Sequence, residues 1–203
     1  MTAMQAALAG FSLSLSLIVA IGAQNAFLLR QGLKREHVLP LVLTCAASDA
    51  LLIAAGVAGF SGLAEALPWA IPVFRWAGAA FLIAYGARSF YAAWKGGAHL
   101  DAASGGGSSL AKAMLTLLAI TWLNPHVYLD TVMLLGSIST GYAPHEVAFG
   151  IGGATASFAF FAALGFGARL LAPVFARPVA WRVLDLGIGL VMWAIALGLM
   201  LGA

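Results

Sequence analysis

The chain has 203 residues, of which 63% are hydrophobic and 8% are charged, and its mean hydropathy is +0.99. A soluble domain carries about 25% charged residues, and a formal charge of +3 from ten basic and seven acidic side chains is too small for a nucleic-acid-binding face. With Cys45 as the only cysteine, the composition excludes cytosolic enzymes, nucleic-acid binders, disulfide scaffolds and dithiol electron carriers, and it predicts a polytopic helical membrane protein.

Six apolar segments are long enough for a membrane-spanning helix, which takes about 20 residues. The first segment, about 5–29, lacks the basic start and short apolar core of a cleavable signal peptide, so we expect it to be retained as the first helix. Together the six segments predict an all-α fold with six transmembrane helices in one transporter domain over residues 1–203. The other five segments are about 38–60, 71–94, 112–137, 146–170 and 181–202.

An internal repeat divides the chain. The stretch 96–109 is rich in glycine and serine, which is typical of a flexible linker, and it separates a first repeat, about 5–95, from a second, about 110–203. Segments 2 and 5 share small residues in ASDALLIAAG and ASFAFFAALG, and segments 1 and 4 align Asn25 with Asn124. Because three helices per repeat is an odd number, the sequence predicts two inverted three-helix repeats, an architecture typical of transporters.

The loop charges predict the orientation. The loops between segments 2 and 3 and between segments 4 and 5 hold no Lys or Arg, and Arg75 is the one basic residue near that end of its segment. Since basic loops stay in the cytoplasm, we expect the odd-numbered loops inside and both termini outside, in the periplasm. The basic residues in or next to the odd-numbered loops are Arg30, Lys34, Arg35, Arg88, Lys95, Lys112, Arg169, Arg177 and Arg182.

Segment 4 contains the only proline in the middle of a predicted span, Pro125 in TWLNPHVYLD. Proline removes a backbone donor and clashes with the preceding turn, so we expect a kink or a break there. Asn124 could satisfy the freed backbone, or the break could expose N–H groups to a polar cavity. In segment 1, the IGAQN sequence places Gly22, Gln24 and Asn25 together, where they would either bind a neighbouring helix or line the same cavity.

Two carboxylates, Asp49 and Asp130, lie within segments 2 and 4. Each costs about 2.5–3.5 kcal/mol at a helix centre, so an intramembrane acid is a functional-site hypothesis by default, and the alternative is a structural acid that is protonated or bonded to serine. With no Lys or Arg expected at the same depth, a cationic substrate or a proton would be the partner. His126 shares a helix face with Asp130. That pair could also serve a membrane acyltransferase, but no nucleophile accompanies it.

The motifs IGAQNAFLLRQGLKREH, CAASDALLIAAG, FRWAGAAFLIAYG and TWLNPHVYLDTVMLLGS closely resemble those of the LysE/ArgO-type basic amino-acid exporters, over essentially the whole chain. The resemblance implies export of L-arginine and L-lysine across the inner membrane, driven by the proton motive force. Ala23 stands where the family's first-helix motif has proline. The residues that match the family's motifs are Gly22, Gln24, Asn25, Asp49, Asn124, Pro125, Tyr128 and Asp130.

The chemistry of the substrate fits these residues. Asp49 and Asp130 suit the cationic groups of arginine, whose guanidinium pairs well with carboxylates, and the N–H groups after Pro125, with Gln24 and Asn25, suit its carboxylate. A desolvated aspartate would exchange a proton for the substrate, with Asp49 favoured over Asp130 and His126 in reserve. The expected partners are the amino acid, protons and the bilayer, without metal, cofactor or nucleic acid. Homo-oligomers, export of another amino acid or a small cation, an acyltransferase and a structural subunit stay open as alternatives.

Overall fold

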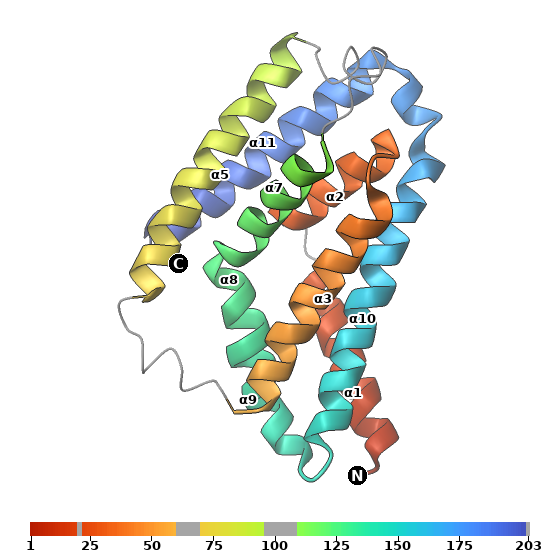
Figure 1. Cartoon of the computed structure of the whole chain (residues 1–203), viewed down its shortest axis with the longest axis vertical. Coiled ribbons are helices and arrows are strands. Elements are labelled where there is room, and N and C mark those ends of the chain that lie inside the picture. The colour runs from red at the N-terminus through yellow and green to blue at the C-terminus, as the bar shows by residue number, and fades with distance from the viewer. Residues whose placement is uncertain (20–21, 60–69, 96–108, 202–203) are drawn as a thin grey trace.

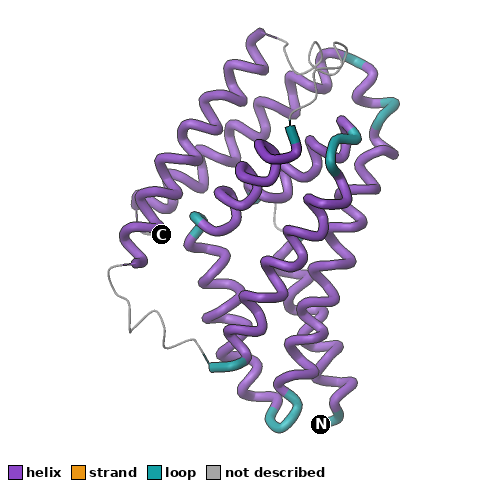
Figure 2. The backbone as a smooth tube through the Cα atoms, in the orientation of Figure 1, coloured by secondary structure: helices purple, strands orange, loops and turns teal. Residues whose placement is uncertain are grey.

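The computed structural model describes residues 1–19, 22–59, 70–95 and 109–201, and every regular element in these ranges is helical (Figures 1 and 2). A π-helical turn, η2 (Leu129–Leu135), joins α8 to α9. Short 3-10 turns follow α9 and α10 and precede α11: η3 (Thr140–Tyr142), η4 (Ala168–Leu171) and η5 (Val174–Ala176). The α-helices are α1 (Ala3–Ile18), α2 (Ala23–Lys34), α3 (Val38–Val57), α5 (Ala70–Lys95), α7 (Leu110–Trp122), α8 (Pro125–Tyr128), α9 (Gly136–Ser139), α10 (Glu146–Gly167) and α11 (Pro178–Leu201).

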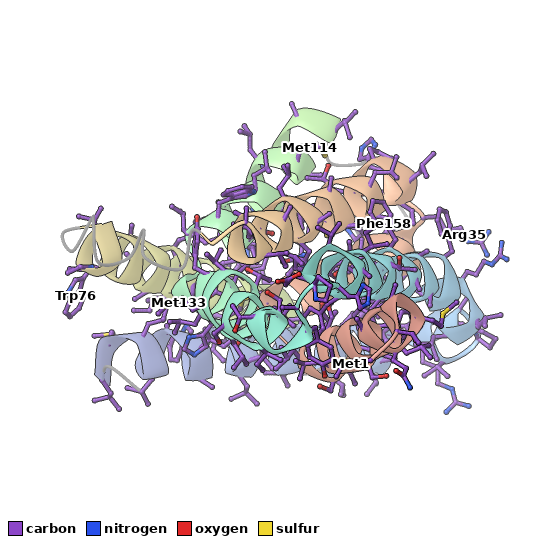
Figure 3. All side chains as sticks on the ribbon, turned by 90° about the horizontal axis from the view of Figure 1, so that it is seen from below. Met1, Arg35, Trp76, Met114, Met133 and Phe158 are labelled. Carbon is purple, nitrogen blue, oxygen red and sulfur yellow. The ribbon has the colours of Figure 1, made fainter. Side chains whose placement is uncertain are left out.

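Several helices are suited to cross a membrane. Within the described residues, α3, α10 with η4, and α11 are each long and apolar enough, and α1 with α2 would form one further, bent span. Large apolar side chains also cover the outside of the bundle; Trp76, which is 54% exposed, points away from it in Figure 3. Because a soluble protein rarely exposes so much contiguous apolar surface, these features confirm the predicted all-α multi-pass membrane protein. The number of six spans stays a prediction.

The prediction of one helix over 5–29 is wrong. The segment forms two helices, α1 and α2, whose axes differ by 81°. Gly22 is the N-cap of α2 in an extended conformation, and the side-chain amide of Asn25 donates a hydrogen bond to the Ile18 carbonyl at the end of α1, at 2.7 Å. This contact supplies a partner for a carbonyl that the ended helix no longer satisfies, so the chain breaks here without a proline.

The expected break in segment 4 is confirmed, because α7 ends at Trp122 and α8 begins at Pro125. The predicted linker 96–109 lies outside the described residues except for Ser109, which caps α7 by accepting a hydrogen bond from the Lys112 backbone N–H. Cys45 is fully buried in the larger apolar core, as expected of a packing residue.

The chain alternates in direction along the molecule. In Figure 1 it rises through α1 and α2, descends α3, rises along α5, descends from α7 to α9, rises along α10 and returns along α11. The turn after α2, the end of α5, the start of α7 and the connection between α10 and α11 therefore lie together at the top. We call this the basic end, because the helix ends there carry basic residues: Lys34, Arg35, Lys95, Lys112, Arg169, Arg177 and Arg182.

Glycines let two pairs of helices pack backbone against backbone. A Cβ on Gly10 of α1 would lie 2.0 Å from the Phe149 carbonyl oxygen of α10, and one on Gly152 of α10 would lie 1.9 Å from the Ala7 carbonyl oxygen of α1. In the same way, Gly56 of α3 faces Gly136 at the start of α9. Small residues at such interfaces allow the close approach that holds membrane helices together.

The packing predicts different effects on stability for two glycine-to-alanine changes. Gly152→Ala should destabilise the protein by about 1–3 kcal/mol, because its methyl group can be accommodated only if α1 and α10 separate. A Cβ on Gly187 of α11 would have no neighbouring atom within 4 Å. Gly187→Ala should therefore leave stability unchanged or raise it slightly, since alanine is the better helix former. Thermal unfolding of the purified protein in detergent measures both. Equal shifts would contradict the backbone contact.

Candidate functional site

The break between α7 and α8 satisfies part of its own backbone. The side-chain oxygen of Asn124 accepts a hydrogen bond from the His126 N–H at 3.2 Å, and the Tyr128 hydroxyl donates to the Trp122 carbonyl at 2.8 Å across the break. The Trp122 indole N–H donates in turn to Ser48 of α3, at 3.2 Å. These bonds match the predicted alternative in which Asn124 satisfies the backbone freed by the proline. The bond from Trp122 to Ser48 anchors the break to α3.

The two broken segments also border one cavity, of about 260 Å³. Its walls include apolar side chains such as Leu17, Phe161 and Ile195 from α1, α10 and α11. Small-molecule sites are concave and mostly apolar, with a few converging polar groups, and this cavity has that character. The sequence-predicted residues that line it are Gly22, Gln24, Asn25, Asp49, Asn124, His126 and Asp130.

Tyr128 and Pro125 are the remaining sequence-predicted residues. Tyr128 is not among the residues that line the cavity, and its hydroxyl bridges the break instead. This hydrogen bond joins the two sides of the broken backbone. Pro125 begins α8, and its side chain lies outside the described part of the structure.

The two predicted carboxylates reach the same cavity from different helices. Asp49 on α3 is 5% exposed, and its Oδ2 accepts a hydrogen bond from Ser157 of α10 at 3.0 Å. Asp130 is half-buried in the first turn of η2, and His126 lies one helical turn earlier. Because π-helical turns displace side chains from the regular helical positions and often occur at functional sites, η2 gives Asp130 a placement that the sequence does not specify.

Gln24 and Ser14 add polar groups from the broken first segment. Gln24 lies in the first turn of α2, and its side-chain oxygen accepts a hydrogen bond from the Thr121 hydroxyl of α7 at 3.0 Å. Ser14 on α1 is 1% exposed and lines the cavity. Neither Ser14 nor Thr121 was predicted from the sequence, since serine and threonine are common in membrane helices and carry no motif of their own.

The sequence interpretation also missed a buried ion pair. Arg30 lies in α2 and not in a loop, and its guanidinium is 3.2 Å from Asp185 Oδ1 of α11; the two side chains are 15% and 1% exposed. The prediction that Arg30 belongs to a loop is therefore wrong, and Asp185 is a buried acid that the sequence analysis did not identify. The sequence prediction places Arg30 in a loop because it ends the first segment at residue 29. An acidic residue in one apolar segment and a basic residue at the end of another were the signal for this ion pair.

The amino-acid sequence is similar to those of known proteins. Residues 15–203 match the family model described as LysE type translocator. The chain is 44% identical over 190 residues to a Yersinia enterocolitica protein named "Arginine exporter protein ArgO", with 93% of each chain covered. It is also 44% identical, over 90% of each chain, to a Mycobacterium bovis protein named "Putative amino-acid transporter". No solved structure matches the chain. The relatives carry transporter names and not enzyme names.

Proposed function

Because the chain belongs to the LysE-type translocator family, we propose that it exports basic amino acids, L-arginine and L-lysine, across the inner membrane in exchange for protons. The observation that carries this proposal is the cavity at the two helix breaks, which holds the carboxylates of Asp49 and Asp130. The name of the Yersinia relative supports arginine. Lysine follows from the same chemistry, because it is also a zwitterion with an extra cationic group.

The proposed architecture is six spans in two inverted three-helix repeats, with α1 to α5 forming the first and α7 to α11 the second. The two breaks support this pairing, since each carries an asparagine that hydrogen-bonds at the break, Asn25 to Ile18 and Asn124 to His126. Both breaks border the cavity. In inverted-repeat transporters, interrupted helices in corresponding positions mark the substrate site.

We expect the basic end to face the cytoplasm and both termini to face the periplasm. Alkaline phosphatase fused after Ala203 should therefore be active, and green fluorescent protein fused there should be dark. As the matched control, the same reporters inserted after Arg177, in the connection between α10 and α11, should give the reverse result. Bright fluorescence without phosphatase activity at the C-terminus would contradict this orientation.

The proton coupling follows from the charge of the substrate. Arginine leaves as a monocation against an interior-negative potential, which opposes its exit by about 2.3 kcal/mol per 100 mV. One proton that enters for each arginine that leaves makes the exchange electroneutral. Asp49 is buried and makes no ion pair with the described part of the chain. It is the proposed exchanger, because its carboxylate can bind either the proton or the substrate cation.

Transport by the purified chain in proteoliposomes tests the function and its coupling together. We expect radiolabelled arginine to exchange in counterflow, lysine to compete with it, and threonine not to compete. An imposed pH gradient should drive arginine uphill, whereas a potassium–valinomycin potential alone should not. Absence of arginine counterflow would contradict the substrate, and arginine movement that follows the potential and ignores the pH gradient would contradict the antiport.

A further inference from the structure

The orientation of the Gln24 side chain is set by a hydroxyl on another helix. Thr121 lies in the last turn of α7, is 1% exposed, and donates its hydrogen bond to Gln24 Oε1. An amide oxygen only accepts hydrogen bonds and an amide nitrogen only donates them. Because the Gln24 oxygen is bonded to Thr121, the amide nitrogen is the group that remains to contact a ligand. The end left to bind another group is Nε2, with two N–H donors.

Two buried donors at the cavity have no oxygen or nitrogen acceptor among the described residues, and the only acceptor beside Gln24 Nε2 is the weakly accepting Cys45 thiol. Gln24 Nε2 is enclosed, and Ser14 Oγ, on a side chain that is 1% exposed, is likewise unpartnered. Both residues line the cavity. Buried polar groups in proteins are nearly always hydrogen-bonded, because leaving one unsatisfied is costly. The arrangement therefore suits a ligand that accepts hydrogen bonds.

The start of α2 favours negative charge in the same place. Gln24 belongs to the first turn of this 12-residue helix, whose N-cap Gly22 makes no side-chain capping bond. The first turn of a helix carries partial positive charge and attracts anions. At the other break, the Asn124 side chain already accepts the His126 N–H. An anion is therefore better placed at the start of α2 than at the start of α8.

We propose that Gln24 and Ser14 bind the α-carboxylate of the amino-acid substrate at the start of α2, and that Thr121 is a positioning residue that keeps the Gln24 donor turned toward it. This inference rests on the proposed function and deepens it, because it gives the anionic group of the substrate its own subsite. The carboxylates of Asp49 and Asp130 are then left for the cationic groups. A ligand without a carboxylate would not depend on Gln24, Ser14 or Thr121.

Binding of arginine and of agmatine, which is arginine without its carboxylate, tests the subsite. Both are titrated into the purified full chain by calorimetry. Thr121→Val should weaken arginine binding about tenfold, or about 1.4 kcal/mol, and leave agmatine binding unchanged, whereas Thr121→Ser should restore the wild-type affinity. Ser14→Ala and Gln24→Leu should likewise weaken arginine selectively, and they test the subsite independently if Thr121→Val does not fold.

The outcomes separate the subsite from the function. Equal weakening of arginine and agmatine, or arginine binding that none of the folded variants changes, would overturn the carboxylate subsite alone. Wild-type protein that binds neither ligand would overturn the proposed function and the subsite with it. Selective loss of arginine binding with rescue by serine supports the proposal, since a merely structural role of Thr121 would affect both ligands.

Discussion

Replacement of Asp49 by asparagine is expected to reduce arginine transport more than a hundredfold while the protein still folds. Asparagine keeps the volume of the side chain and an oxygen that can accept the Ser157 hydrogen bond, so the change removes mainly the charge. A buried charge that loses its partner costs about 3–5 kcal/mol, and here the charge left unpaired would belong to the substrate. We expect Asp130→Asn to have the same effect.

Initial rates of arginine counterflow measure this loss, with elution as a single species to show that each variant folds. Glu146→Gln is the matched control, because it makes the same chemical change in the first turn of α10, at a residue that is not among those lining the cavity. It should transport like the wild type. Near-normal transport by both Asp49→Asn and Asp130→Asn would mean that these carboxylates are structural.

The buried ion pair predicts a large and non-additive effect on stability. Arg30→Gln removes the guanidinium that lies 3.2 Å from the buried Asp185 carboxylate, and Asp185→Asn removes the charge of that carboxylate. Each change breaks the buried pair and should destabilise the protein by about 3–5 kcal/mol. The double variant has neither charge and should recover much of this loss, since a buried pair of charges contributes little beyond what its desolvation costs.

A double-mutant cycle on thermal unfolding in detergent measures the coupling. Arg182→Gln serves as the control, because Arg182 is an exposed arginine on the same helix as Asp185, and such surface changes stay within about 0.5 kcal/mol. Single effects that simply add in the double variant would contradict a direct interaction between Arg30 and Asp185.

Much of the helical arrangement could be predicted, because hydropathy and length alone define an apolar span. The segments 38–60 and 146–170 correspond closely to α3 and to α10 with η4. The break before Pro125 was also predictable, since proline acts on its own backbone whatever its neighbours are. Likewise, an ionisable residue in an apolar segment is unusual enough for Asp49 and Asp130 to be identified as cavity candidates.

The features that were missed depend on contacts between distant residues. The α1–α2 break is supported by Asn25, whose amide could equally have bound a neighbouring helix, and only the fold places it on Ile18. Arg30 and Asp185 are far apart in the sequence, so their pairing follows from how α2 packs on α11. The π-helical turn at Asp130 has no local sequence signal of its own.

The glycine contacts between α1 and α10 also fix the register of the two helices. A shift of α1 by one residue is a screw motion of about 1.5 Å along its axis and about 100° around it. It would bring Ala9 or Phe11 to the Phe149 carbonyl, where even the Cβ of an alanine in place of Gly10 would overlap the oxygen. A one-residue shift is therefore blocked in both directions. As a result, Ser14 on α1 keeps a constant height relative to Phe161 on α10, and the two walls of the cavity to which these residues belong stay level with each other.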